Sequence, residues 1–332
     1  MRNKVDIIAV AKQAGVSIST VSRTMNHPNL VKPATRKRID DAIRTLGYIR
    51  NRAAQAMHGK RSGTIGLIVP TIDHTIFAEV IQVFSDTIAD FGFSLILTTH
   101  GYDLQKEYQL LRKLLEHRVD GVALIGFDHL DETMGLLESQ KIPVVSLWNY
   151  DAGAHLPCVG ATNFQAGKMA AQHLWDLGHR HVGFVFSPIA GNDRAAARMQ
   201  GAGSVFAAPA FQVETEYSIT AAKAKCQQAL ADHRGITALL CGNDVIGTGA
   251  IYAAQKLGLD VPGDLSIMGI GDFKGSADIE PPLSTVRLPA REIGERAGTL
   301  LCRLVAEEPV DETHIECDLR LLPRATSVVV TG

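Results

Sequence analysis

A short segment near the N-terminus places side chains with contact chemistry on one face of a predicted helix. Ser17 can cap this helix, which runs from Ile18 to about Met25, because its hydroxyl can accept a hydrogen bond from a free backbone amide of the first turn. Helical spacing groups an apolar side chain, two hydroxyls and a guanidinium on the outer face: Ile18, Ser19, Ser22 and Arg23. Val21 and Met25 share the other face. The outer face therefore carries groups suited to contacting a partner.

The positive charge of the chain is concentrated in the same region. Residues 1–61 hold thirteen Lys or Arg and three Asp or Glu, although the whole chain has a net charge of −2. Residues 62–332 hold twenty Lys or Arg and thirty-two Asp or Glu. A basic head of this kind attracts a polyanion, and its binding should weaken steeply with salt because neutralised phosphates release counterions. Charge alone leaves open a merely solvated basic surface.

Three short helices are predicted to hold the contact face in place. The first runs between Asp6, its N-cap, and Gly15, and the third begins near Pro33 and ends at Gly47. The apolar residues of the three helices recur at helical spacing and predict one small core: Ile7, Ala11, Ala14, Val21, Met25, Ile39, Ala42, Ile43 and Leu46. A helix-prone segment over 51–58 follows, and then a basic, glycine-containing linker. So short a helix is marginal in water, so we expect it to order only when a partner holds it.

Beyond residue 63 the pattern changes to buried strands alternating with amphipathic helices, which is typical of a doubly wound α/β domain. The first series is predicted as strands over 64–69, 94–98 and 121–125 with helices over 77–90 and 106–117. A second series has a strand over 181–186, a helix over 221–232, and a stretch over 233–240 that echoes 117–124. The repetition predicts two similar lobes with a cleft between them, where ligands bind at the carboxyl ends of the strands.

Several other classes of protein find little support in the sequence. The five cysteines form no C-x-x-C pair and the twelve histidines show no metal-binding or catalytic spacing, so we expect no zinc site, disulfide framework, metal or cofactor. No G-x-G-x-x-G follows the first strand and no P-loop occurs, which disfavours a nucleotide-cofactor enzyme on a related α/β fold. The two lobes would also suit a solute-binding receptor of a transport system. The basic head, the lack of a signal peptide and the lack of ~20 consecutive apolar residues favour instead a cytoplasmic protein that does not contact a membrane.

Short motifs along the chain closely resemble those of the lactose-repressor and galactose-repressor (LacI/GalR) family. They are VAKQAGVSISTVSR at 10–23, LGY at 46–48, NRAA at 51–54, LGHR at 177–180, CGND at 241–244, LGLDVP at 257–262 and PLSTV at 282–286. The stretch GIGDF at 269–273 also resembles gluconate-type members. The resemblance covers essentially the whole chain and implies a transcription regulator, not an enzyme, which represses a carbohydrate or sugar-acid catabolic operon.

The resemblance implies three parts and a homodimer. A helix-turn-helix DNA-binding head would occupy residues 1–48, a hinge helix and linker 49–62, and an effector-binding and dimerisation domain 63–332. The N-terminal lobe would comprise about 63–161 and 290–320, and the C-terminal lobe about 162–289 and 321–332. Two heads of a dimer would bind double-stranded operator DNA, and a small-molecule effector between the lobes would change operator affinity by ordering or releasing the paired hinges.

The resemblance also implies which residues contact DNA: Ser17, Ile18, Ser19, Thr20, Ser22, Arg23, Asn26, Lys32, Thr35, Tyr48, Asn51, Arg52 and Met57. In the family the second helix lies in the major groove, so Arg23 would bind O6 and N7 of a guanine and Ile18 a thymine methyl. Lys32, Thr35, Tyr48 and Asn51 would contact the phosphate backbone. Met57 stands where similar regulators place a leucine that opens a base step through the minor groove. Methionine is long and apolar enough for that role but more flexible, and a methionine on a hinge surface is the alternative.

The predicted cleft departs from that of similar sensors of neutral sugars and bases. Such sensors carry an aspartate after the strand over 266–270, where this chain has Gly271 followed by Asp272, and a second acidic residue where Leu147 stands. Arg194 and Arg198 are present, and the latter matches a usual ligand contact of the family. This combination favours an acidic effector, a sugar acid or a sugar phosphate, because arginine forms paired charge-assisted hydrogen bonds to carboxylate and phosphate. A neutral sugar is the alternative if Asp193 neutralises Arg194 or if Asp272 turns inwards.

The full predicted effector-binding set is Phe77, Trp148, Arg194, Arg198, Asn243, Gly271 and Asp272. Phe77 and Trp148 are interpreted either as apolar walls against a flat face of the ligand or as ordinary core residues. Asn243 is a candidate hydrogen-bond partner of the ligand, while Asp244 is predicted to cap the helix that follows.

Overall fold

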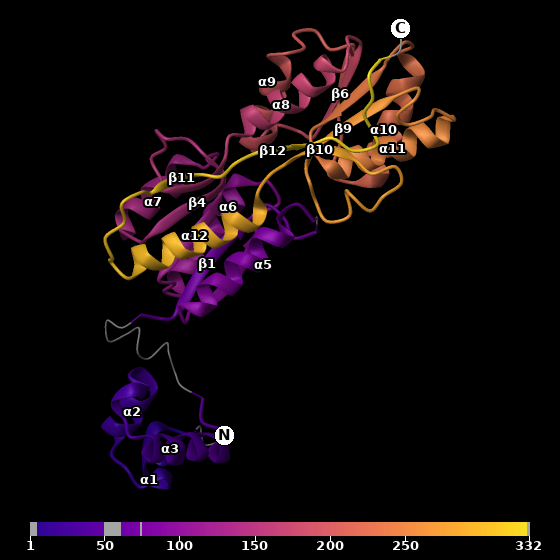
Figure 1. Cartoon of the computed structure of the whole chain (residues 1–332). Helices are drawn as coiled ribbons and strands as arrows, with labels where there is room; N and C mark the ends of the chain where they lie inside the picture. Colours follow the sequence, from indigo (N-terminus) through magenta and orange to yellow (C-terminus); the bar gives the residue numbers. More distant parts are fainter. Residues whose placement is uncertain (1–4, 50–60, 74, 331–332) are drawn as a thin grey trace. The chain divides into compact units, whose positions relative to one another are not determined.

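The computed structural model describes residues 5–49, 61–73 and 75–330. Contacts between Cα atoms divide the chain into two compact units, residues 1–62 and 63–332, which are coloured along the sequence in Figure 1. Each unit has a hydrophobic core of its own. Most of the predicted hinge, with the predicted DNA contacts Asn51, Arg52 and Met57, lies outside the described residues.

Three α-helices form the first unit within residues 5–49. They are α1 (Ile7–Ala14), α2 (Ile18–Asn26) and α3 (Pro33–Leu46), with a 3-10 turn η1 (Pro28–Leu30) between the last two. Asp6 and Ser17 cap α1 and α2, each accepting a hydrogen bond from the backbone amide three residues further on. Gly15 and Gly47, both in the left-handed conformation with φ +62°, end α1 and α3. These caps and ends, with the buried core of the unit, confirm the predicted helical head.

Two sheets of six strands each form the second unit within the described residues. The first sheet has the order β11-β5-β4-β3-β1-β2 with all neighbouring strands parallel. Its strands are β1 (Thr64–Val69), β2 (Ser94–Thr99), β3 (Gly121–Ile125), β4 (Val144–Asn149), β5 (Cys158–Ala161) and β11 (His314–Glu316). The parallel register places Ile125, the last residue of β3, opposite Leu147 of β4, so the carboxyl ends of both strands meet at one edge.

The second sheet has the order β12-β10-β9-β8-β6-β7, with antiparallel pairing between β10 and β12 and parallel pairing elsewhere in its described strands. Its strands are β6 (Val182–Phe186), β7 (Phe211–Glu214), β8 (Ala238–Cys241), β9 (Ser266–Gly271), β10 (Ser284–Arg287) and β12 (Arg320–Leu322). Two mainly parallel sheets in one unit confirm the predicted two-lobed α/β architecture. The lobe that contains the first sheet is called the first lobe below, and the other the second lobe.

Eight α-helices accompany the two sheets within the described residues. The first lobe has α5 (Thr75–Asp90), α6 (Leu104–Glu116), α7 (Asp131–Gln140) and α12 (Ala290–Val305), and α5 lies alongside α12 (Figure 1). The second lobe has α8 (Asn163–Asp176), α9 (Asp193–Gly203), α10 (Ile219–Asp232) and α11 (Asp244–Leu257). In the second lobe α8 packs on α9 and α10 packs on α11.

Glycines allow α8 and α9 to approach closely. A Cβ atom on Gly167 of α8 would collide with the backbone carbonyl of Arg198, and one on Gly201 of α9 would collide with the carbonyl of Phe164. The close contact brings Asn163, at the start of α8, within hydrogen-bond distance of the Arg198 side chain. This packing therefore positions one of the predicted effector-binding arginines.

Three helices begin earlier than predicted, and in two of them a capping side chain sets the first turn, which apolar spacing does not reveal. The helix predicted over 106–117 begins at Leu104, since the Asp103 carboxylate accepts hydrogen bonds from two backbone amides of the first turn. The helix predicted over 221–232 begins at Ile219, capped by Ser218. The helix predicted over 77–90 begins at Thr75.

The described residues show neither a membrane segment nor a metal cluster. No helix among them is long and apolar enough to cross a lipid bilayer. No group of three or more His, Cys, Asp or Glu side chains among them could hold a metal ion. The five cysteines are buried and unpaired, and burial raises the pKa of the Cys226 thiol to about 12. That thiol is therefore protonated at neutral pH and is a poor nucleophile.

Candidate functional site

The helix α2 presents a polar face at the surface of the first unit. Ile18 is 46% exposed, and Ser17, Ser19 and Arg23 are exposed as well. Val21, on the opposite side of the helix, is completely buried in the core of the unit. The structure therefore brings these four predicted DNA-contacting residues together at the surface.

Arg23 has all its guanidinium donors available on this face. Its guanidinium makes no hydrogen bond or ion pair with any residue that the structure describes. Arg36 and Arg44 of α3, by contrast, form surface ion pairs with Asp40 and Asp41. A guanidinium with free donors can bind a guanine edge or a phosphate in two places at once.

The other predicted DNA contacts of the head are more varied in exposure. Thr20, Ser22, Thr35 and Tyr48 are half-buried, and Lys32 is exposed at the start of α3. The Thr20 hydroxyl lies 2.8 Å from the Ser17 hydroxyl, and Tyr48 packs against the core of the head. Asn26 is the last residue of α2, and its side chain is not among the described ones.

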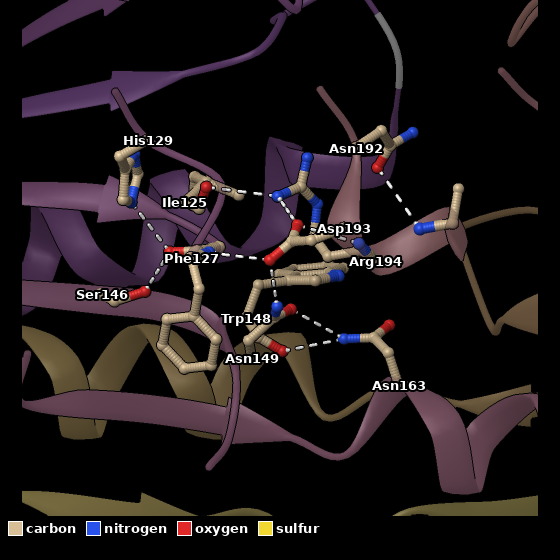
Figure 2. Close-up of polar contacts among 12 residues, drawn as sticks. Ile125, Phe127, His129, Ser146, Trp148, Asn149, Asn163, Asn192, Asp193 and Arg194 are labelled. Carbon is tan, nitrogen blue, oxygen red and sulfur yellow. Dashed lines mark hydrogen bonds and ion pairs between the residues drawn. The ribbon is translucent and has the colours of Figure 1, made fainter. Parts of the chain in front are cut away.

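In the second unit, Arg194 is buried where α9 of the second lobe meets the first lobe. Its Nη1 donates to the Asp193 carboxylate at 2.7 Å and to the Ile125 carbonyl at 3.2 Å. Asp193 also accepts hydrogen bonds from the Phe127 amide at 2.7 Å and from Nδ2 of Asn149 at 2.6 Å (Figure 2). The Asp193 carboxylate therefore neutralises Arg194. From the sequence, this pairing is a condition under which a neutral sugar would be the alternative effector.

Arg198, four residues further along α9, has a different set of partners. It is buried, its Nε donates to Oδ1 of Asn163 at 2.7 Å, and its Nη1 donates to the Gly242 carbonyl at 3.1 Å. No carboxylate among the described residues forms an ion pair with it. Burial lowers the pKa of Arg198 from its usual value, because desolvation disfavours the charged form. A buried guanidinium without a counter-ion creates a place where an anionic ligand is stabilised.

The residue that caps α11 is Asn243, not Asp244. Asn243 caps the helix by accepting a hydrogen bond from the Ile246 amide at 2.9 Å, so the prediction that Asp244 is the cap is wrong. Asp244 is buried and accepts hydrogen bonds from the hydroxyls of Ser276 and Thr285, both at 2.6 Å. Burial raises the pKa of the Asp244 carboxyl. Nδ2 of Asn243 is buried without a hydrogen-bond partner among the described residues.

The Asp272 carboxylate forms ion pairs with two arginines. Its carboxylate oxygens lie 2.6 Å from Nε of Arg287 and 2.5 Å from Nη2 of Arg324. The preceding residue, Gly271, has φ +142°, and a Cβ atom there would collide with the ring of Phe273. Both carboxylate oxygens of Asp272 therefore already have partners, and its role toward an effector stays a prediction.

Trp148 and Phe77 form a buried aromatic pair with ring centroids 5.2 Å apart and an interplanar angle of 67°. Both belong to the main hydrophobic core. Trp148 also has a left-handed backbone, with φ +82°, and its Nε1 is buried without a hydrogen-bond partner among the described residues. The pair therefore packs as core, and it contains one buried N–H donor that has no acceptor among the described residues.

Sequence reasoning missed two tyrosines that connect the lobes. Tyr102 follows β2 in the first lobe and Tyr217 follows β7 in the second, and their rings stack with centroids 5.9 Å apart. Nδ2 of Asn192 donates to the Tyr217 hydroxyl at 2.9 Å. Burial, and next the neighbouring Tyr217, raise the pKa of Tyr102. Both tyrosines follow the carboxyl ends of strands, and this position was the signal that could have identified them.

Two protein-family models match the chain. Residues 6–51 match the family described as bacterial regulatory proteins, lacI family. Residues 171–327 match a periplasmic binding protein-like domain. The first match covers the helical head and the second covers most of the second lobe.

Curated relatives align over nearly the whole chain. Catabolite control protein A of Priestia megaterium is 30% identical over 323 residues, which are 96% of this chain and 97% of that protein. The HTH-type transcriptional repressor PurR of Proteus mirabilis is 31% identical over 324 residues, 95% of this chain and 94% of that protein. The HTH-type transcriptional regulator GntR of Pseudomonas aeruginosa is 27% identical over 325 residues, 96% of this chain and 94% of that protein.

Solved structures share the fold. The lac repressor dimer bound to operator and the anti-inducer ONPF is 25% identical, with a TM-score of 0.83 over 98% of this chain and all of that chain. The transcription regulator GntR from Chromobacterium violaceum is 29% identical, with a TM-score of 0.75 over 80% of this chain and 99% of that chain.

Proposed function

This chain belongs to the LacI family of bacterial regulatory proteins, and from that membership we propose that it is a homodimeric repressor of a carbohydrate or sugar-acid catabolic operon. It is a DNA-binding transcription regulator with an effector-binding domain, not an enzyme. In the proposal, the heads of the dimer bind double-stranded operator DNA. An acidic effector held between the lobes of the second unit controls their affinity for it.

The proposed DNA-reading residues are those of the exposed face of α2. Arg23 binds O6 and N7 of a guanine, Ile18 contacts a thymine methyl, and Ser19 bonds a base edge with little discrimination. Support comes from the exposure of all three and from the free donors of Arg23. The backbone contacts proposed for Lys32, Thr35, Tyr48 and Asn51, and the minor-groove role of Met57, rest on the family resemblance.

The main support for an acidic effector is that three carboxylates of the second unit are bonded to protein donors, whereas the buried Arg198 has no carboxylate partner in the described part of the chain. The carboxylates of Asp193, Asp244 and Asp272 are all bonded to protein donors. Arg198 has no carboxylate partner among the described residues, and Nε1 of Trp148 and Nδ2 of Asn243 add unpaired donors. An effector carboxylate or phosphate supplies the negative charge and the acceptors that this set lacks.

A neutral sugar is the second candidate effector. Its hydroxyl oxygens could accept hydrogen bonds from Trp148 and Asn243, whose donors are unpaired. It would leave the charge of Arg198 uncompensated, and burial of an uncompensated charge is costly. The acidic effector is therefore favoured.

Calorimetric titration of the full-length protein with gluconate, phosphogluconate and glucose tests the proposal. We expect at least one of the two acids to bind at least about tenfold more tightly than glucose, because a hydrogen bond to a charged group is worth more than one between neutral groups. Arg198→Gln should abolish the difference, while Arg234→Gln, at an exposed position of the same lobe, should preserve it. Tighter binding of glucose than of both acids would contradict the proposed effector class, as would an unchanged preference in a folded Arg198→Gln protein.

A further inference from the structure

A chain of buried polar side chains leads away from Arg198. Nε of Arg198 donates to Oδ1 of Asn163 at 2.7 Å. Nδ2 of Asn163 donates to Oδ1 of Asn149 at 2.9 Å, and Nδ2 of Asn149 donates to Oδ2 of Asp193 at 2.6 Å (Figure 2). Each amide accepts a hydrogen bond on one side and donates on the other. The chain therefore has a single direction, from a guanidinium to a carboxylate, and hydrogen bonds aligned in this way strengthen one another.

The far end of this chain is a contact between the two lobes. Asp193 begins α9 in the second lobe, and its carboxylate accepts a hydrogen bond from the Phe127 amide of the first lobe at 2.7 Å. Arg194, also in α9, donates to the Ile125 carbonyl at the end of β3. Asp193, Arg194, Ile125 and Phe127 are called the interlobe latch below. Asn149 is the last residue of β4 in the first lobe, so its bond to Asp193 also crosses between the lobes.

Two side chains of the first lobe fix the peptide bond between Gly126 and Phe127 in the interlobe latch. The Gly126 carbonyl accepts hydrogen bonds from the Ser146 hydroxyl at 2.6 Å and from Nε2 of His129 at 3.0 Å. Because a carbonyl only accepts, Nε2 of His129 carries a hydrogen, and the other ring nitrogen lies 2.8 Å from the buried Glu107 carboxylate. These hydrogen bonds fix the peptide that carries the Phe127 amide. A change at Asp193 therefore alters the hydrogen bond between the lobes, because the Phe127 segment does not move to follow it.

We propose that Asn163 and Asn149 are positioning residues that transmit the state of Arg198 to the interlobe latch. The inference rests on the proposed function, because it takes the effector to bind at Arg198. An anion bound there draws the guanidinium away from Oδ1 of Asn163. Arg198 then no longer polarises the side-chain amides of Asn163 and Asn149. The hydrogen bond from Asn149 to Asp193 weakens as a result. The interlobe latch loosens, which allows the lobes to change their relative position.

Hydrogen–deuterium exchange of the Phe127 amide in the effector-free, full-length protein tests this relay. Asn163→Asp keeps an acceptor for Arg198 but removes the donor to Asn149, and no side-chain hydrogen bond joins Asn163 to Phe127 among the described residues. We expect exchange of the Phe127 amide to become about tenfold faster. The hydrogen bond from Asn149 to the Asp193 carboxylate is weakened, and local opening at the interlobe latch becomes easier. Asn149→Asp, which places a second carboxylate against Asp193, should accelerate the exchange further.

The matched control is Gln172→Glu on the exposed side of α8. It also converts an amide to an acid and removes a donor to a carboxylate, that of Asp176 at 2.7 Å. Exchange at Phe127 should stay at the wild-type rate in this variant. Wild-type exchange at Phe127 in Asn163→Asp would overturn the relay, whether or not Asn149→Asp accelerates it. Equal acceleration in Asn163→Asp of the β8 amides, in the core of the second lobe, would also overturn it, because Asn163 would then merely stabilise the lobe.

The exchange measurement separates the relay from the proposed function. No ligand enters it, so a negative result leaves the acidic effector standing. Conversely, a failure of gluconate and phosphogluconate to bind leaves the exchange result unchanged and removes the effector class alone.

Discussion

Nη1 of Arg194 lies 2.7 Å from Oδ1 of Asp193, so one buried guanidinium of α9 is neutralised by the residue before it. Arg198 lies about one helical turn further along the same helix and has no such acid among the described residues. An anion that approaches α9 must therefore displace a carboxylate at Arg194 but meets none at Arg198. This difference has consequences that can be measured.

Replacing Asp193 with Asn should tighten the binding of an anion. The substitution removes the charge that competes for Arg194 and makes a second guanidinium available, so we expect gluconate or phosphogluconate to bind about three- to tenfold more tightly in calorimetric titration. Asp41→Asn is the matched control, because it also removes a carboxylate that is paired with an arginine, Arg44, but in the first unit. Anion binding to Asp193→Asn that is no tighter than to Asp41→Asn would refute the competition.

Replacing Arg23 with Gln should weaken binding to the operator selectively. Loss of a two-point contact to guanine is expected to cost about 1–3 kcal/mol of specific binding and to change binding to random DNA much less. Arg44→Gln serves as the control, since Arg44 is already paired with Asp41 on α3. Fluorescence anisotropy with operator and random duplexes measures both. An equal loss on the two duplexes would mean that Arg23 contacts only phosphate.

Replacing Gly126 with Ala should destabilise the second unit more than replacing Gly101 with Ala. Both glycines have positive φ, +84° and +66°, so both substitutions strain the backbone. A Cβ atom on Gly126 also collides with Nη1 of Arg194, whereas one on Gly101 has nothing within 4 Å among the described residues. We expect the free energy of unfolding to fall by about 1 kcal/mol for Gly101→Ala and by about 3 kcal/mol for Gly126→Ala in urea denaturation. Equal losses would show that Arg194 moves aside without cost.

Stability should rise with pH on the acidic side of neutrality. Burial is the first cause that lowers the pKa of His100, His173 and His179 below the usual 6.5. Between the lowered pKa and 6.5 the unfolded chain binds more protons than the native one, so the free energy of unfolding increases with pH in that window and levels off above it. His179→Gln should reduce this slope and His155→Gln, at an exposed position, should not, in urea denaturation from about pH 5 to about pH 7.5. An equal slope of the free energy of unfolding against pH in both variants would contradict the assignment of that slope to His179.

The helical head could be predicted from the sequence because its signals are local. Asp6 and Ser17 cap helices through amides three residues away, and Gly15 and Gly47 end helices in a conformation that glycine adopts readily. The alternation of strands and helices in the second unit is equally local. Helix starts were less well predicted, since the first turn of α6 depends on Asp103, whose position carries no apolar periodicity.

The polar contacts of the second unit could not be predicted, because they join residues far apart in the chain. Asp244 was expected to cap α11, but the hydroxyls of Ser276 and Thr285, 32 and 41 residues away, hold its carboxylate and leave the cap to Asn243. Asp193 likewise bonds Asn149 from 44 residues away. The pairing of Arg194 with Asp193 was anticipated as an alternative, because the two residues are adjacent, whereas the partners of Arg198 are Asn163 and Gly242, which are 35 and 44 residues away.

The most direct test of the account is the preference of the full-length protein for specific DNA. Fluorescence anisotropy should be measured with promoter fragments from the upstream region of its own gene and from neighbouring catabolic operons, against random duplexes of equal length, at about 0.15 M salt. We predict that at least one promoter fragment binds about a thousandfold or more tightly than random DNA, and that gluconate or phosphogluconate changes this affinity. Equal affinity for all fragments and random DNA, with and without these acids, would contradict the assignment as an operator-binding, effector-controlled regulator.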